Sequence, residues 1–587
     1  MSLGQDPFNV AIQLHQNGRI GEAIAIYKKL FATHSGNHQY LYLLGTAYLQ
    51  TGKVKESVEL LTASLKLNRS NLEALKNLGI AQLAAENPSD ALKTFNSLVK
   101  SKPSLPEAHF NQANALKKLG KLSDALNAYE RAIKLKPNYI EALYNRGNLL
   151  MDQGKLEDAL NSYQKVIDFA PKVAEAHNNK GSALKQMKRF EEALQSFEIA
   201  VSCKPQFPSA QNNIGAVLNE LKRFDEALLA LDKAVTIDSD NAEIFNNKGV
   251  AHKELKQYPE AQKAFEKAIT LKSDYENAYI NLGNLFKELK QMEPALSAYN
   301  RAIEINSDSI DGHFFKGLLQ LMMGDLKEGW ELYEWRHKAD LQGVPFSPDK
   351  PLWNIKDAPS YKRILVHGEQ GIGDQIMFAS LLKELKSCCN EVLVRLDERL
   401  IPLFERSFGK GFYYISNKEE VKQDRYDACV SMGSLCKEFR MNEEDFSGSP
   451  YLLDDEIKTS KLREQLRNQK LENEKIVGIS WKSSNEKSGD KRSLNLVRFL
   501  QGLDLDNVVF ANLQYGEVAD EIKQAETELN ITFLNSDSVD NKEDIDGLAS
   551  LIQCCDLVIS IDNSTVHLAG ALGKEVHTLL PVTSDWR

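Results

Sequence analysis

Small side chains recur every 34 residues through more than half of this 587-residue chain. The first series comprises Ala11, Gly45, Gly79, Ala113, Gly147, Gly181, Gly215, Gly249, Gly283 and Gly317. A second series, twelve residues further on, comprises Ala23, Ser57, Ala91, Ala125, Ala159, Ala193, Ala227, Ala261, Ala295 and Gly329. Glycine inside a helix costs about 1 kcal/mol relative to alanine, so a small residue kept at one phase needs a packing reason. The two series predict pairs of closely packed helices, repeated ten times.

Large apolar side chains stand four residues after the second series, where they would fill the space that the small residues leave. They include Tyr27, Phe95, Tyr129, Tyr163, Phe197, Phe265 and Tyr299. Proline recurs between units, where a helix has to end, at Pro103, Pro137, Pro171 and Pro205. The pattern resembles the tetratricopeptide repeat, over ten units spanning about residues 5–338. That resemblance implies an α-solenoid, a right-handed superhelix whose groove binds peptides or proteins.

Asparagine occupies a further column, two residues before the first small position, in seven successive units. The column comprises Asn77, Asn111, Asn145, Asn179, Asn213, Asn247 and Asn281. In the tetratricopeptide family this phase lies on the groove-lining first helix of each pair, so the resemblance implies a ladder of carboxamides. An amide offers both a donor and an acceptor, which suits an extended peptide of any sequence. The alternative is that these asparagines only bond locally between units.

The residue pattern changes after the repeats. A proline-containing stretch, 339–360, is predicted as a linker or a strapped-down connection. Beyond it, short β-branched runs alternate with helical segments, which predicts parallel sheets covered by helices. A charged connection, 454–473, separates the runs into two groups. We therefore expect an α-solenoid followed by α/β, with two Rossmann-like lobes at 361–453 and 474–587 and a ligand cleft between them.

Two segments carry a second resemblance. They read "EQGIGDQIMFASLLKEL" and "CDLVISIDNSTVHLAGALGKEVHTLLP", and "YEWR" and "DWR" accompany them. These segments resemble the heptosyltransferase family (glycosyltransferase family 9), notably its cytoplasmic members fused to tetratricopeptide repeats. The resemblance implies a GT-B fold and inverting, metal-independent transfer, with a nucleotide-diphosphate sugar on the second lobe and the acceptor on the first. An asparagine ladder joined to a transferase domain is also similar in architecture to protein O-GlcNAc transferase, which holds a protein acceptor in this way.

Candidate donor-binding residues gather in the second lobe. The strand "LVISID" ends at Asp562, and Ser564 and Thr565 open a helix whose N-terminus offers free amides and partial positive charge to a diphosphate. His567 lies on its first turn, and Gly570 would allow close approach to the sheet. The resemblance adds residues in strand-to-helix loops: Lys482, Lys491, Arg492, Ser493 and Gln514. The alternatives are helix capping for Asp562 and Ser564, packing for His567 and solvated charges for the loop cations.

Asp374 is the candidate catalytic residue. It follows Gly371 and Gly373, at the start of a predicted helix, where it can cap the helix while facing the cleft. In the family that these residues resemble, the aspartate of this "GD" is the base that takes the acceptor's proton. Glu369, two residues before Gly371, is the second candidate for the base. Capping alone is the alternative explanation of Asp374.

Composition excludes several other classes. The net charge is −10, from 72 basic and 82 acidic residues, without a sustained basic block, so nucleic acid is not the expected partner. No run of about 18 apolar residues or leader pattern occurs, so we expect a cytoplasmic protein without a membrane span. The seven cysteines form no CxxC pair, so neither a disulfide framework nor a metal site is expected. We expect no cofactor beyond the donor substrate.

Two functional hypotheses follow. The first is a glycosyltransferase that modifies a protein or peptide held by the repeats, and the second is a non-catalytic repeat scaffold with a degenerate or incomplete transferase domain. The sequence ends at Trp586 and Arg587 directly after a predicted strand, so we expect either a fragment or an incomplete second lobe. The residues identify neither the donor's base and sugar nor the acceptor.

Overall fold

The structure is a computed structural model, and it describes residues 6–338, 350–446, 448–483, 492–503 and 506–580. The chain divides into two compact units, 1–271 and 272–587. The division falls inside the repeats, so the last helix pairs belong to the same unit as the α/β part.

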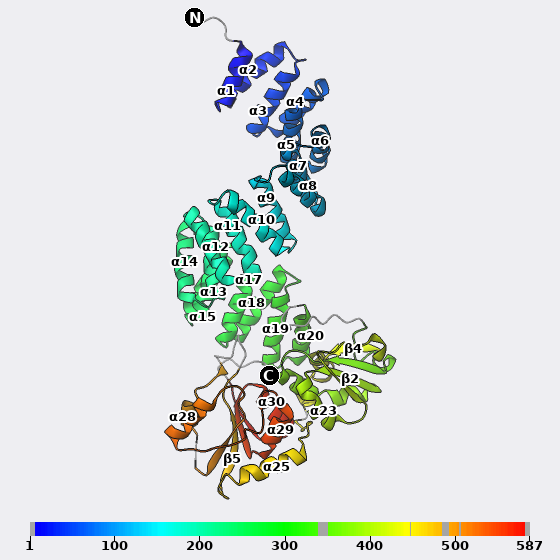
Figure 1. Ribbon diagram of the computed structural model, residues 1–587, viewed down its shortest axis with the longest axis vertical. Helices are drawn as coiled ribbons and strands as arrows, with labels where there is room; N and C mark the ends of the chain where they lie inside the picture. The colour runs from blue at the N-terminus through cyan, green and yellow to red at the C-terminus, as the bar shows by residue number, and fades with distance from the viewer. Residues whose placement is uncertain (1–5, 339–349, 447, 484–491, 504–505, 581–587) are drawn as a thin grey trace. The chain divides into compact units, whose positions relative to one another are not determined.

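The first unit consists of helix pairs (Figure 1). Its helices are α1 (Pro7–Gln16), α2 (Ile20–Thr33), α3 (His38–Gln50), α4 (Val54–Leu67), α5 (Leu72–Ala84), α6 (Pro88–Ser101), α7 (Pro106–Lys118), α8 (Leu122–Leu135), α9 (Ile140–Asp152), α10 (Leu156–Phe169), α11 (Ala174–Gln186), α12 (Phe190–Cys203), α13 (Pro208–Glu220), α14 (Phe224–Ile237), α15 (Ala242–Glu254) and α16 (Tyr258–Leu271). Four more helices of the same kind open the second unit: α17 (Glu276–Glu288), α18 (Met292–Ile305), α19 (Ile310–Met323) and α20 (Leu326–Tyr333). Across the described residues the ten predicted helix pairs are therefore confirmed.

The small residues pack as the repeat pattern predicts. A Cβ added at Gly147 would lie 2.6 Å from the ring of Tyr163, and one at Gly181 would lie 2.7 Å from the ring of Phe197. Both rings are buried. The second helix of each pair thus places an aromatic ring against the glycine of the first, and a side chain at the glycine would force the two helices apart.

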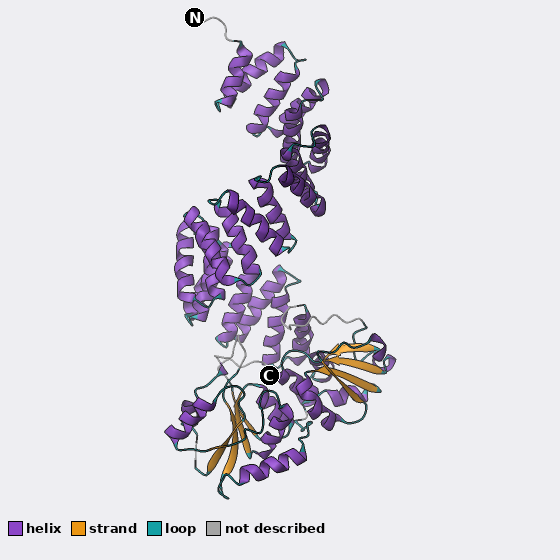
Figure 2. Ribbon diagram, viewed as in Figure 1, coloured by secondary structure: helices purple, strands orange, loops and turns teal. Residues whose placement is uncertain are grey.

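The strands form two parallel sheets in the second unit, shown in orange in Figure 2. The first sheet has the order β3-β2-β1-β4 and comprises β1 (Arg363–His367), β2 (Glu391–Leu396), β3 (Phe412–Ser416) and β4 (Ala428–Ser431). The second has the order β7-β6-β5-β8-β9 and comprises β5 (Lys475–Ser480), β6 (Val508–Asn512), β7 (Phe533–Leu534), β8 (Leu557–Ile561) and β9 (Val576–Leu579). The α-solenoid followed by α/β is thus the class that the sequence predicts.

Helices precede, connect or follow the strands of each sheet along the chain. In the first group they are α21 (Ile372–Ala379), α22 (Leu382–Ser387), α23 (Ile401–Phe408) and α24 (Cys436–Phe439). In the second they are α25 (Glu456–Arg467), α27 (Leu496–Leu500), α28 (Ala519–Leu529), α29 (Ile545–Cys554) and α30 (Ser564–Ala571). Strand order reverses beside β1 in the first sheet and beside β5 in the second. Ligands of open α/β sheets bind at such reversals, outside the carboxyl ends of the strands.

Two connections have more structure than their sequence indicates. Within the predicted linker, the described residues 350–360 are strapped to the first sheet, since Leu352 pairs with Cys429 and the Trp353 N–H donates to the Cys429 carbonyl over 2.8 Å. The predicted connection 454–473 carries α25, which packs against α29. Among the described residues no helix is long and apolar enough to cross a membrane.

Candidate functional site

Asp374 lies on the first turn of α21, behind the carboxyl end of β1. The residue is 7% exposed, and its Oδ2 accepts a hydrogen bond from the Gly371 backbone N–H over 3.2 Å. The carboxylate therefore does cap the helix, as the alternative explanation holds. Capping and proton transfer use the same group and are compatible, because the Asp374 carboxylate has further acceptor capacity.

Glu369 is held in a buried ion pair. Its Oε1 and Oε2 accept from the Arg336 guanidinium over 2.8 and 3.0 Å, and Oε1 also accepts from the Gly433 N–H over 2.6 Å. Burial opposes ionisation of Glu369, but Arg336 outweighs burial and lowers the pKa of the carboxyl to about 2. A carboxylate so strongly held as an anion is a poor proton acceptor, which argues against Glu369 as the base.

In the second lobe Asn563, rather than Asp562 or Ser564, caps α30. Its Oδ1 accepts from the Thr565 N–H over 3.0 Å, and its Nδ2 donates to the Ser480 hydroxyl over 2.7 Å. The capping explanation therefore does not apply to Asp562. The Asp562 side chain is 10% exposed, and its carboxylate pairs with Arg492, with Oδ2 and Nη1 3.1 Å apart. The buried carboxylate thus holds a cation at the carboxyl edge of the second sheet.

The other predicted donor-binding residues have defined partners at the same edge. The Lys482 ammonium is ion-paired with Glu521 of α28. The Gln514 Oε1 accepts from the Ser480 hydroxyl and from the backbone N–H groups of residues 481 and 482, so this carboxamide braces the end of β5. The Ser493 hydroxyl accepts from the residue 483 N–H over 3.1 Å. Lys491 lies outside the described residues.

The N-termini of α21 and α30 meet. A Cβ added at Gly373 would lie 3.3 Å from Ser564 Cα and 3.2 Å from His567 Cδ2. Only glycine allows this approach without displacing a neighbour, so Gly373 brings the turn that carries Asp374 against the start of α30. Thr565, on the same turn of α30, is fully buried. Gly373, the residue before Asp374, thus lies against Ser564 and His567, two of the predicted donor-side residues.

Gly570 does not have the role that the sequence suggested. It is exposed, and a Cβ added there would meet no atom within 4 Å. The prediction that Gly570 lets α30 approach the sheet was wrong, because this residue lies on the outer side of the helix. Close approach at α30 instead involves Gly373, from the other lobe.

The asparagine column forms hydrogen bonds between repeats. Nδ2 of Asn179 donates to the Tyr144 hydroxyl and to Asn148 Oδ1 over 3.0 and 2.9 Å. Similar bonds run from Asn77 to Thr46, from Asn145 to Asn114, from Asn213 to Asn178 and from Asn247 to Asn212. All seven members of the column are half-buried. Local bonding between units is therefore observed, and the donor is the amide nitrogen of the asparagine. The Oδ1 atoms of Asn145, Asn213 and Asn247 accept no hydrogen bond within the described residues.

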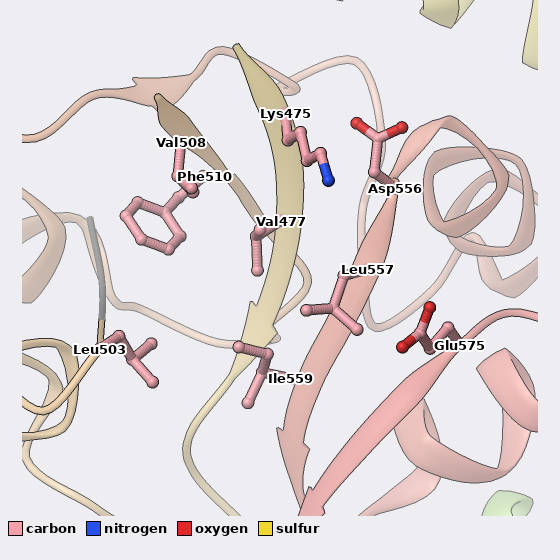
Figure 3. A pocket seen from close by; sticks show the side chains of 9 residues that line it. All are labelled: Lys475, Val477, Leu503, Val508, Phe510, Asp556, Leu557, Ile559 and Glu575. Carbon is pink, nitrogen blue, oxygen red and sulfur yellow. The ribbon is translucent and has the colours of Figure 1, made fainter. Parts of the chain in front are cut away.

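A cavity of about 320 Å³ lies elsewhere on the second lobe (Figure 3). Its lining includes Lys475, at the start of β5, and Asp556 and Glu575, which precede β8 and β9. These residues lie at the amino ends of the strands. Because ligands of parallel sheets bind at the carboxyl ends, this cavity is separate from the candidate site.

Comparison with known proteins identifies the first part of the chain. The family description "TPR repeat" matches residues 113–154, 147–188 and 217–256, and "Tetratricopeptide repeat" matches 174–207 and 240–308. A further description, "Anaphase-promoting complex, cyclosome, subunit 3", matches 16–98. This chain therefore contains tetratricopeptide repeats.

Individual proteins are similar over part of their length. Protein FlbA of Caulobacter vibrioides is 31% identical over 291 residues, which cover 46% of this chain and 48% of FlbA, so the chain spans about half the length of that curated relative. YrrB, described as a TPR protein with an unusual peptide-binding site, is 22% identical, with a TM-score of 0.29, over 32% of this chain and 96% of YrrB. Yeast Tom70 is 12% identical, with a TM-score of 0.33, over 57% of this chain and 91% of Tom70.

Sequence reasoning missed two residues at these edges. Asn563 has a local signal, because asparagine before a helix is a preferred N-cap. Arg336 is the arginine of the "YEWR" that accompanies the second resemblance, but this motif does not indicate which residue the arginine contacts. Its partner lies 33 positions away, and only the fold brings the two together.

Proposed function

We propose that this chain is a glycosyltransferase, inverting and metal-independent, that transfers a sugar from a nucleotide-diphosphate sugar to a protein or peptide held by the repeats. The observation that carries the proposal is the approach of Gly373 to Ser564 and His567. It brings a buried carboxylate on one lobe to a helix N-terminus on the other. A cytoplasmic location is part of the proposal.

The chemistry divides between the lobes. The acceptor hydroxyl oxygen attacks the anomeric carbon, the bond from that carbon to the diphosphate oxygen breaks, and the hydroxyl proton passes to Asp374. The departing diphosphate needs positive potential, which the N-terminus of α30 and the cations Arg492 and Lys482 supply. Attack from the face opposite the leaving group inverts the anomeric centre.

The two strand-order reversals support this division of roles. In the first lobe the loops after β1 and β4 enclose the Arg336–Glu369 pair, and the Arg336 side chain is 1% exposed. In the second lobe the loops after β5 and β8 carry Arg492, whose side chain is 23% exposed, and Lys482, at 40%. Accessible cations suit a nucleotide in the second lobe, whereas the first is filled by protein.

The repeats supply the proposed acceptor site. Tetratricopeptide repeats typically bind peptides or proteins. The half-buried asparagines of the column use Nδ2 for the bonds between units, which leaves Oδ1 of residues such as Asn213 and Asn247 as an acceptor. These oxygens can accept from the N–H groups of an extended peptide.

A second candidate is a scaffold that binds proteins through its repeats without catalysis. It is favoured by the family matches, which lie within residues 16–308, and by the pairing of Arg492 and Lys482 with acidic side chains.

Thermal unfolding of the full chain with 1 mM UDP, GDP, ADP or dTDP separates the two candidates. A diphosphate at 100 times its Kd stabilises the native state by about 2.7 kcal/mol. The transferase hypothesis requires that at least one of the four raise the melting temperature. If none does, the scaffold is the better account.

A further inference from the structure

The end of the last helix pair makes close contacts with the loop that leads to Asp374. Tyr333 is the last residue of α20, and Arg336 lies in the 3-10 turn η1 (Glu334–His337) that follows. The loop, residues 368–371, joins β1 to α21. Tyr333 and Arg336 are 2% and 1% exposed, so this contact is fully buried.

Arg336 uses its whole guanidinium group at this contact. Nε and Nη2 form a bidentate pair with Glu369, and Nη2 also donates to the Ser434 hydroxyl over 2.9 Å. Nη1 donates to the Tyr333 carbonyl over 3.1 Å and to Glu334 Oε1 over 2.6 Å. The guanidinium lies over the Tyr333 ring, 4.3 Å from its centroid. Glu369 in turn accepts from the Gly433 N–H. A planar fork with five donors satisfies this arrangement, and a lysine ammonium does not.

Tyr333 holds the next residue of the loop. Gln370 has a φ of +59°, a left-handed backbone conformation that is uncommon for residues other than glycine. Its Nε2 donates to the Tyr333 hydroxyl over 2.8 Å. Such a conformation persists only where the surroundings hold it, and it is often found at functional sites. The next residue, Gly371, donates its N–H to the Asp374 carboxylate. Arg336 and Tyr333 thus hold Glu369 and Gln370, and the residue after Gln370 is hydrogen-bonded to the proposed base.

We propose that Tyr333 and Arg336 are positioning residues for Asp374, through which the last tetratricopeptide unit sets the geometry of the acceptor side of the site. This inference rests on the proposed function. Both side chains act through Glu369 and Gln370, and neither touches the reacting atoms. Because a misplaced catalytic group can cost about 100-fold in rate, a small shift of the 368–371 loop should be seen in kcat.

The test uses the full-length protein with Tyr333→Phe and Arg336→Lys. Tyr333→Phe removes only the hydroxyl that holds Gln370 and keeps the buried ring. The matched control is Arg440→Lys, since Arg440 is 6% exposed and forms a bidentate pair with Glu384 in the same lobe, at 2.8 and 2.9 Å. Within the described residues the Arg440 side chain forms no hydrogen bond with the loop. The first readout is amide hydrogen exchange of residues 369–376, measured without any ligand. The second is kcat and donor KM with the nucleotide sugar whose diphosphate stabilises the protein.

Both variants should exchange faster at 369–376 by about tenfold or more, while Arg440→Lys leaves that segment unchanged. Transfer by Tyr333→Phe should fall by about tenfold in kcat with donor KM within about twofold of the parent. Unchanged exchange and unchanged kcat in Tyr333→Phe, or equal effects in Arg440→Lys, would overturn the proposal. If the parent itself transfers no sugar, the proposed function fails, and the exchange of the loop still decides whether these residues position it.

Discussion

The carboxylate of Asp562 and the guanidinium of Arg492 form an ion pair, with Oδ2 and Nη1 3.1 Å apart, where the second sheet ends. Without Arg492 a buried negative charge would face the proposed diphosphate site. Arg492→Gln should therefore raise the Kd for the bound nucleoside diphosphate by about tenfold or more, since hydrogen bonds to charged groups contribute about 1.5–3 kcal/mol. Calorimetric titration measures this. The control is Arg498→Gln, an exposed arginine of α27, and equal affinity in both variants would remove Arg492 from the site.

The asparagine column can be separated into structural and binding roles. Asn179 bonds to the neighbouring unit, whereas Asn111 makes no side-chain hydrogen bond within the described part of the chain. Asn179→Ala should lower the free energy of unfolding by about 1 kcal/mol, and Asn111→Ala should leave it nearly unchanged. Denaturant titration followed by circular dichroism measures this difference.

The same two variants test acceptor binding. If the column contacts the acceptor, Asn111→Ala should weaken binding of an acceptor protein that this chain glycosylates, without loss of stability. Full affinity in the Asn111 variant, with loss only in the Asn179 variant, would mean that the column is structural.

Substitution of Gly373 tests the packing contact between the two lobes. Gly373→Ala would place a Cβ 3.2–3.3 Å from His567 and Ser564, and overpacking of this kind typically costs about 1–3 kcal/mol. We expect Gly373→Ala to lower the melting temperature of the second unit and to reduce transfer. Gly570→Ala is the control, because it meets open space on an exposed helix and should be neutral or stabilising by up to about 1 kcal/mol. Scanning calorimetry should show a lower melting temperature for Gly373→Ala but not for Gly570→Ala, and equal melting temperatures of the two variants would refute close approach at Gly373.

Because the Glu369 carboxylate is buried beside Arg336, we expect the stability of the fold to decrease at acidic pH. Its pKa falls from 4.5 to about 2 despite burial, because Arg336 stabilises the anion. The unfolded chain therefore binds the proton first, so the stabilisation is complete above about pH 5 and is lost as the pH falls toward 2. The difference in pKa corresponds to about 3 kcal/mol.

Glu369→Gln should remove that part of the acid dependence. The melting temperature of the parent should fall more between pH 5 and pH 3 than that of the variant. The variant should be less stable at pH 7, because Arg336 then keeps only one of its two anionic partners, Glu334. Glu384→Gln, which changes the partner of Arg440, is the matched control. Parallel pH profiles for the parent and Glu369→Gln would contradict the assignment.

Much of the fold could be predicted because its signals are local and periodic. The spacing of Gly147 and Tyr163 encodes contact between two adjacent helices, so one unit of sequence contains both partners. The alternation of β-branched runs with helical segments, in two groups, likewise predicted the two parallel sheets. The helix α25 was missed as an element because its charges are those of a solvated connection, and only its packing on α29 explains it.

The site was less predictable because its geometry depends on distant partners. Asp374 and Asp562 could be selected from local motifs, yet the pairing of Asp562 with Arg492 and of Glu369 with Arg336 joins segments that no local pattern connects. Gly570 illustrates the same limit, since a glycine's neighbours depend on which face of the helix is covered.

The rate of sugar transfer by Asp374→Asn, at saturating donor and in the full-length protein, tests the central claim most directly. The amide oxygen can still accept from the Gly371 N–H, so the cap and the fold should persist while the base is lost. We expect kcat to fall by about 10² to 10⁴-fold while the melting temperature stays nearly unchanged. A variant that transfers at the parent rate per folded molecule would contradict it, and Asp374 would then only cap α21.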